Sequence, residues 1–276
     1  MSFDFSKAFE EARTDMDNKK LFLVLLGASG NGKSFAQGTF GVKTLYLYTQ
    51  GESHGPRAAG TMGKSNIVPV CIDREGDKSL NADEALKRLH SILDDTDALA
   101  KGKFGAVSID GFSELEDLVR NSTKFKVMTT TESGKHNGYA ETGATLFQLK
   151  EIISKLKRLQ RVLNVHVCAT ETLTVKELNE EGLILDSSPQ LIGYSVATGV
   201  LQQFDDVMII GRMQKKDKVS YRFQLIAGST KKSLDGTTHE VKKTFNFSPR
   251  LTGVDILSMP PTLEANLQEL AKLKQG

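Results

Sequence analysis

The sequence contains no tryptophan, only two cysteines and six prolines, and aromatic residues make up just 7% of its 276 positions. Leucine, isoleucine and valine must therefore supply most of the buried surface. Cys71 and Cys168 are too few to form a disulfide framework or a cysteine zinc site. Both lie in apolar runs, which predicts buried free thiols and a reducing compartment.

A strong net charge and long apolar segments are also missing. A net charge of +2 gives no global attraction to nucleic acid or to a membrane surface, so contact with a phosphate backbone requires local clusters of Lys and Arg. The longest apolar run, Leu21 to Leu26, is far too short to span a bilayer, and the start Met-Ser-Phe-Asp does not resemble a secretion signal. We therefore expect a large globular domain in the cytoplasm without a membrane partner.

Apolar runs alternate along the chain with amphipathic stretches. The amphipathic stretches carry their apolar residues at helical spacing, whereas the apolar runs are short and bounded by glycine or charge. This alternation predicts an α/β domain with a mainly parallel central sheet and helices on both faces. The expected strands are 21–26, 44–49, 66–72, 105–110, 165–170 and 207–211, and the expected helices are 82–93, 115–119 and 146–163.

The ends of the chain have a different pattern from this core. Residues 219–227 and 242–247 alternate apolar and polar side chains, which predicts an antiparallel extension of the sheet. We expect an N-terminal helix over 1–20, a core over 21–255 and a helical tail over 256–276. Residues 121–143 lack periodicity and are rich in Thr, Ser, Lys and Gly, which is typical of a functional loop.

The clearest motif follows the first predicted strand. Gly27-Ala28-Ser29-Gly30-Asn31-Gly32-Lys33-Ser34 matches the G-x-x-x-x-G-K-[ST] phosphate-binding loop, and Phe35 continues it. Glycines let several backbone N–H groups point at one anion, and a following helix adds its positive N-terminal end. Lys33 would contact the β- and γ-phosphates of ATP, and the Ser34 hydroxyl would bind Mg²⁺.

Such a loop requires an acid at the end of a neighbouring apolar strand. Asp110 ends the strand 105–110, where it would hold a Mg²⁺-bound water, the Walker-B role. The alternative is an N-cap of a helix that starts after it. Glu52, after the strand 44–49, is a candidate to orient the attacking water, or else a solvated loop carboxylate.

Other polar residues end a third strand. Thr170 and Glu171 are candidates to sense the γ-phosphate, with a capped strand end as the alternative. His54 and His166 lack metal-ligand spacing around them, and we interpret His166 as a strand or core histidine.

The order of these motifs resembles the RecA-core ATPases of phages, specifically the short RecA-like single-strand annealing proteins. The resemblance covers roughly residues 20–250 and includes Ser188-Pro189-Gln190-Leu191-Ile192-Gly193 and Phe204-Asp205-Asp206-Val207. It implies ATP and Mg²⁺ as cofactors, a homo-oligomeric ring or filament, and single-stranded DNA as partner in recombination or repair. A phage origin would place the protein in the bacterial host cytoplasm.

The resemblance also implies roles for particular residues. Glu52 matches the position of the family's catalytic glutamate. Lys124, Lys126 and Lys135 lie where a DNA-contacting loop follows the Walker-B strand, whereas the second such segment, 176–182, is acidic and is more typical of a hairpin turn. A neighbouring subunit would supply a cation to the γ-phosphate; Lys231 and Lys232 are the candidates, with Arg212 and Arg222 as rivals.

Two other functions stay open at this point. In the first, ATP controls the interfaces of an oligomeric scaffold that does not bind DNA, which agrees with the weak net charge. In the second, the chain is a metabolic kinase, although no substrate lid or acceptor site is recognisable. The basic stretches 150–161, 212–218 and 231–243 favour DNA binding, but each is also compatible with a solvated surface.

Overall fold

A computed structural model describes residues 20–60, 66–178, 184–191, 194–215, 218–225, 231–232, 238–239 and 255–258. The predicted helix before residue 20, the strand 242–247 and the C-terminal helix 263–273 lie outside these ranges. The strand prediction for the rest of the chain is confirmed at all six positions, with ends that differ by a few residues.

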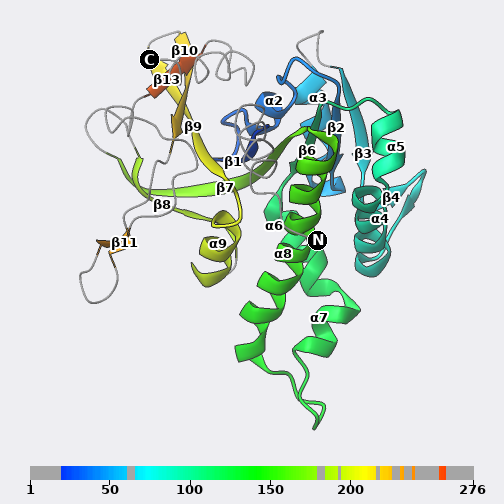
Figure 1. Cartoon of the computed structure of the whole chain (residues 1–276). Helices are drawn as coiled ribbons and strands as arrows, with labels where there is room; N and C mark the ends of the chain where they lie inside the picture. The colour runs from blue at the N-terminus through cyan, green and yellow to red at the C-terminus, as the bar shows by residue number, and fades with distance from the viewer. Residues whose placement is uncertain are drawn as a thin grey trace, which may run out of the picture.

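The centre of the molecule is a sheet of six parallel strands in the order β9-β1-β7-β6-β2-β3 (Figure 1). Two antiparallel strands, β10 and β13, continue the sheet beyond β9. The alternating pattern of residues 219–227 predicted β10, whereas β13 was not predicted. The strands are β1 (Phe22–Gly27), β2 (Thr44–Tyr48), β3 (Ile67–Cys71), β6 (Ala106–Asp110), β7 (His166–Leu178), β9 (Asp206–Lys215), β10 (Lys218–Leu225) and β13 (Asp255–Ser258).

Both faces of the sheet are covered by helices. Alternate side chains of β1 enter two different clusters: Phe22, Val24 and Leu26 pack under one layer of helices, and Leu23 and Leu25 pack under the other. This explains why the strand has no polar position, because neither face meets water. The second layer contains α2 (Lys33–Gln37) and α3 (Gly55–Gly60).

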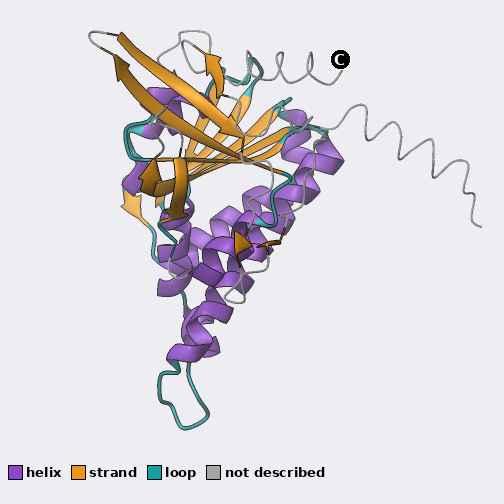
Figure 2. Ribbon diagram, turned by 90° about the vertical axis from the view of Figure 1, so that its left-hand side faces the viewer, coloured by secondary structure: helices purple, strands orange, loops and turns teal. Residues whose placement is uncertain are grey.

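The first layer is larger and contains the remaining described helices, and it tapers away from the sheet (Figure 2). None of the helices in the described ranges is long and apolar enough to cross a bilayer. The helices of this layer are α4 (Ala82–Asp94), α5 (Thr96–Lys101), α6 (Phe112–Asn121), α7 (Thr123–Met128), α8 (Gly138–Leu163) and α9 (Tyr194–Leu201).

Residues 121–143, predicted as a loop, are mostly ordered into helices. Ser122 caps α7 by accepting from the N–H of Phe125, and Asn137 caps α8 by accepting from the N–H of Tyr139. An isolated bridge between Thr130 and His136 closes the turn between them. We call residues 122–147 the projection, because α7, this turn and the start of α8 extend beyond the sheet at the bottom of Figure 1.

Strand β7 is longer than predicted and leaves the sheet. Its last residue paired with β1 is Thr172, opposite Gly27, and beyond that point it forms an antiparallel hairpin with β8 (Ile184–Pro189). This antiparallel pairing on either side agrees with the hairpin interpretation of 176–182, although residues 179–183 lie outside the described ranges. Three further pieces are short: the 3-10 turn η1 (Gln50–Glu52), the pair β4 (Arg74–Glu75) and β5 (Lys78–Ser79), and the pair β11 (Lys231–Lys232) and β12 (Thr238–His239).

The domain boundary expected between 255 and 256 falls inside β13. The described part of the supposed helical tail, residues 256–258, is thus a strand that pairs with β10.

Candidate nucleotide-binding site

The loop between β1 and α2 has the backbone conformation that the motif predicts. Gly30 and Gly32 have φ values of +78° and +86°, in the region that residues with a side chain rarely adopt. The loop closes on itself through the N–H of Asn31, which donates to the carbonyl of Ala28 at 3.2 Å. Ser29 and Gly30 are exposed at its crest, so an anion can reach the backbone N–H groups.

The loop is also attached to strand β9. The Asn31 side-chain amide donates to the carbonyl of Ile210 at 3.1 Å. A Cβ at Gly27 would lie 2.7 Å from the side chain of Ile210 and 2.8 Å from its carbonyl oxygen. Glycine at position 27 is therefore required by this close approach, and the two contacts fix the loop between β1 and β9.

Lys33 currently binds the loop itself. Its Nζ donates to the carbonyls of Gly27 at 2.8 Å and Ala28 at 3.2 Å. Burial lowers the pKa of Lys33, and the nearby negative charges of Asp110, Glu52 and Glu171 oppose that shift. The lysine therefore lies within electrostatic range of three carboxyl groups that come from β6, η1 and β7.

Helix α2 has only five residues, shorter than the helix that the motif predicts. Its dipole is correspondingly small, so an anion at this loop would depend more on the loop N–H groups and on Lys33. The helix is nevertheless firmly positioned, because the buried amide of Gln37 donates to the carbonyls of Ile109 at 2.8 Å and Cys168 at 3.3 Å. These bonds join α2 to β6 and β7 directly.

Asp110 lies at the C-terminal end of β6 and is only 3% exposed. Its Oδ1 accepts from the Thr170 hydroxyl at 2.6 Å, and its Oδ2 accepts from the hydroxyl of Tyr46. Asp110 does not cap the following helix, since Gly111 is the N-cap of α6 and no side chain caps it. The capping alternative for Asp110 is thereby removed.

One strand separates Asp110 from the loop strand, whereas the sequence suggested direct neighbours. Strand β7 pairs with β1 on one side and with β6 on the other. Thr170, near the point where β7 leaves the sheet, connects the two halves: it donates to Asp110 and accepts from the N–H of Gly111 at 2.9 Å. A sensor role for Thr170 stays a prediction, but its position next to Asp110 is clear.

Glu52 lies in η1, just after β2, and is half-buried. A Cβ on Gly111 would lie 3.2 Å from its Cγ, which places the Glu52 side chain directly over the residue after Asp110. Burial raises the pKa of Glu52, Asp110 and Glu114 raise it further, and Lys33 lowers it. A solvated loop carboxylate would not have this environment.

Glu171 is 1% exposed and has only one of its oxygens engaged by a side chain. Oε1 accepts from the Ser113 hydroxyl at 2.6 Å, whereas the buried Oε2 has no hydrogen-bond partner among the residues that the structure describes. Burial raises the pKa of Glu171 to about 7, against the opposing effects of the Ser113 hydrogen bond and of Lys33. Through Ser113 the carboxyl group touches the first turn of α6.

Several predicted residues lie elsewhere. Lys124, Lys126 and Lys135 are on the projection, at the opposite end of Figure 1 from α2. The backbone of Lys231 and Lys232 forms β11, and its pairing does not test a role in a neighbouring site. His166 is a structural residue, as interpreted: its Nδ1 accepts from the N–H of Leu21 at 3.2 Å, and burial lowers its pKa to about 4.

The two cysteines are free, as predicted. Cys168 is fully buried, whereas Cys71 is half-buried and donates to Asp73 at 3.2 Å.

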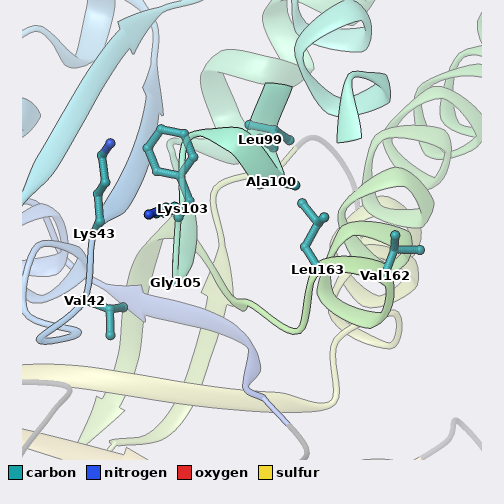
Figure 3. A pocket seen from close by; sticks show the side chains of 9 residues that line it. Val42, Lys43, Leu99, Ala100, Lys103, Gly105, Val162 and Leu163 are labelled. Atoms are coloured by element: carbon teal, nitrogen blue, oxygen red, sulfur yellow. The ribbon is translucent and has the colours of Figure 1, made fainter. Parts of the chain in front are cut away.

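A hollow at the opposite, N-terminal end of the parallel strands is not part of this site (Figure 3). It lies where β2 and β6 begin, about 15 Å from the ends that carry Glu52 and Asp110, given the rise of a strand. Its lining contains no carboxylate or glycine-rich turn for a nucleotide and consists of Val42, Lys43, Leu99, Ala100, Lys103, Phe104, Gly105, Val162 and Leu163.

The residues present fit Mg²⁺ bound together with a nucleotide. Mg²⁺ is usually held by one or two protein groups plus substrate phosphates and water. The described residues contain no cluster of three or more His, Cys, Asp or Glu that could hold a metal ion. Ser34 and Asp110 are the available protein groups. A scan of family models finds none that matches this chain, and a search of curated proteins finds none either.

Proposed function

We propose that this protein binds ATP with Mg²⁺ in the loop 27–34 and hydrolyses it. The observation that carries this proposal is the glycine loop, whose Gly30 and Gly32 have positive φ values and whose Asn31 is bonded to β9. Its Lys33 is held at the loop carbonyls, and the charges of Asp110, Glu52 and Glu171 act on the same ammonium group. A chance glycine-rich turn would not have acids from three other segments of the chain near its lysine.

Each residue has a distinct part in the proposed reaction. Lys33 exchanges its bonds to the loop carbonyls for bonds to the β- and γ-phosphates. Ser34 and Asp110 would hold Mg²⁺, the latter through water, and the ion would neutralise the charge that develops on the phosphates. Glu52 orients the attacking water and accepts its proton, for which a raised pKa is suitable at neutral pH.

We further propose single-stranded DNA as the partner, contacted by the projection. Tyr139 is fully exposed and Phe147 is 55% exposed, which provides the aromatic surface on which bases stack. Lys124 lies 5.2 Å over the Phe147 ring but also pairs with Glu151 at 2.7 Å. Lys126 and Lys135 are exposed and form no salt bridge within the described part of the chain, so they are the better phosphate contacts.

A route for coupling supports the same proposal. Helix α6 begins two residues after Asp110 and ends at Asn121, next to α7. Its first turn is bonded to Glu171 through Ser113, and its last turn is bonded to α8 through Arg120 and Glu141 at 3.1 Å. DNA on the projection can therefore influence the nucleotide end of the sheet through one helix of ten residues.

The RecA-like assignment and a ring or filament of identical subunits are part of this proposal. In such an assembly Lys231 or Lys232 of one subunit would reach the γ-phosphate on the next. Lys232→Ala should then leave ATP binding intact and abolish turnover, and normal turnover in that variant would remove Lys232 from the role.

The test is ATP turnover with and without single-stranded DNA, for the unmodified chain and for Lys33→Ala. If single-stranded DNA stimulates ATP hydrolysis and Lys33→Ala abolishes that hydrolysis, both the ATPase and the DNA partner are supported. Hydrolysis that DNA does not change, together with no DNA binding at low salt, retains the ATPase and rejects the DNA partner; the ATP-controlled scaffold is then the better function.

A further inference from the structure

Tyr46 is a buried residue whose polar group lies inside the candidate site. It is the third residue of β2, opposite Ser108 of β6, and it is 0% exposed. From the sequence it reads as one more apolar position in a strand. A buried tyrosine hydroxyl must have a hydrogen-bond partner, and here the partner is the carboxylate of Asp110.

The hydroxyl of Tyr46 lies close to both residues that would hold Mg²⁺. It donates to Oδ2 of Asp110. Burial and Asp110 raise the pKa of Tyr46, and the Ser34 side chain is near enough to lower it against these larger effects. Thr170 occupies the second oxygen of Asp110 from the neighbouring strand. Two neutral hydroxyls thus fix the orientation of one carboxylate without neutralising its charge.

Gly55 shows how closely this arrangement is packed. A Cβ at this position, the first of α3, would lie 2.3 Å from Oδ2 of Asp110 and 2.6 Å from the Tyr46 hydroxyl. Such distances are below any ordinary contact, so the side chains of Asp110 and Tyr46 can occupy their places only because residue 55 has no side chain. The contact between Tyr46 and Asp110 is therefore built by three segments of the chain.

We propose that Tyr46 is a positioning residue for Mg²⁺, which orients the carboxylate of Asp110 relative to Ser34. A carboxylate has about four lone-pair positions; two are used by Tyr46 and Thr170, and the others are left for water bound to the ion. Groups that orient metal ligands in this way typically contribute 10- to 100-fold in metal affinity. The inference rests on the proposed function, because it concerns the same Mg²⁺–nucleotide site.

The test measures binding of a fluorescent ATP analogue as Mg²⁺ is titrated, so that it does not depend on turnover. Tyr46→Phe removes one hydroxyl and keeps the ring. We expect the Mg²⁺ concentration for half-maximal effect to rise about tenfold, with affinity in EDTA unchanged. Tyr48→Phe is the matched control, because Tyr48 is on the same strand and the titratable groups that act on its hydroxyl are Cys71, Arg74 and Asp73, not Asp110.

Gly55→Ala is a second variant that keeps every hydroxyl. Alanine is favoured over glycine in a helix, so this change should not harm α3 itself, yet it must displace Asp110 or Tyr46. We expect the same selective loss of the Mg²⁺ effect. Thermal unfolding followed by circular dichroism verifies that each variant folds, and if Tyr46→Phe does not fold, Gly55→Ala decides the question.

The outcomes separate this inference from the proposed function. An unchanged Mg²⁺ requirement in Tyr46→Phe, or an equal loss of nucleotide affinity with and without Mg²⁺, would overturn the positioning role alone. Absence of Mg²⁺-dependent binding in the unmodified chain would overturn the site and the inference together.

Discussion

The ammonium group of Lys33 lies 2.8 Å from the carbonyl oxygen of Gly27, the first residue of its own loop. The Lys33 side chain therefore lies within the loop, and a ligand that binds there must replace its hydrogen bond to the Gly27 carbonyl. A triphosphate can do so, because its charge offers stronger hydrogen bonds than a neutral carbonyl.

Removal of this lysine should weaken nucleotide binding. We expect Lys33→Ala to weaken affinity for Mg²⁺–ATP by at least tenfold, since a hydrogen bond to a charged group contributes about 1.5–3 kcal/mol. Isothermal calorimetry measures this directly. Lys43→Ala is the control, because Lys43 lies at the N-terminal end of β2, away from the loop, where it donates to the carbonyl of Gly102. Equal losses of nucleotide affinity in both variants would show that the effect comes from the lower positive charge of the protein and not from the loop.

Glu52 should be required for hydrolysis but not for binding. We expect Glu52→Gln to reduce kcat by about 10²–10⁴-fold, the usual contribution of a general base, with little change in nucleotide affinity. Because burial and Asp110 raise the pKa of Glu52, turnover in the unmodified chain should fall on acidification at a pH above the ordinary range of a glutamate. A pH–rate profile without an acid limb would contradict this assignment.

Glu171 should make stability depend on pH. Its pKa is raised to about 7 in the folded protein, so the folded state holds a proton that the unfolded state loses near pH 4.5. The free energy of unfolding should therefore decrease as pH rises from about 4.5 to 7. Glu171→Gln should remove this decrease and be more stable above pH 7, by about 3 kcal/mol at most.

Urea unfolding of the two proteins at pH 5, 6, 7 and 8, without nucleotide, measures this difference. The stability advantage of Glu171→Gln should grow with pH and then level off. A difference between the two proteins that is constant across this range would show that Glu171 does not titrate there.

The projection should determine DNA binding. We expect Tyr139→Ala to weaken binding of single-stranded DNA by about tenfold, since stacking contributes about 1–3 kcal/mol per base. Lys126→Ala with Lys135→Ala should lower the salt dependence of the affinity, because each lost phosphate contact reduces the slope by about 0.7. Fluorescence anisotropy at several salt concentrations measures both effects.

Matched controls lie outside the projection. Val162→Ala removes an exposed apolar side chain at the far end of α8, and Lys87→Ala with Lys101→Ala removes two exposed charges from α4 and α5. If these variants lose DNA affinity as much as the projection variants do, the contact is not at the projection.

The sequence predicted the strands well because most of them lie in the core, as β1 does along its whole length, and their residues are largely apolar. It did not predict the helices of the projection for the opposite reason. The first buried apolar residue of α8 is Ala144, six residues after the helix begins, and α7 buries only Phe125. Helices that extend beyond the core have no apolar stripe, so periodicity cannot reveal them.

The sequence predicted the motifs of the candidate site but not the contacts between their residues. Lys33, Asp110 and Glu52 were recognisable from their residue types and from their places after apolar strands. Tyr46 was not, because a tyrosine inside an apolar strand is indistinguishable from a core residue until its hydroxyl is placed. The separation of Asp110 from the loop strand by β7 likewise depends on strand order, which local sequence patterns do not encode.

The length of β7 has a mechanical consequence. Thirteen residues in one strand span about 43 Å, and hydrogen bonds tie its first half to β1 and β6 while its second half carries the hairpin with β8. Thr170 and Glu171 lie near the middle of this continuous strand, just before its last pairing with β1 at Thr172. A displacement of the hairpin would therefore act directly on the backbone next to these two residues, because the nucleotide end of the sheet is also where the hairpin is anchored.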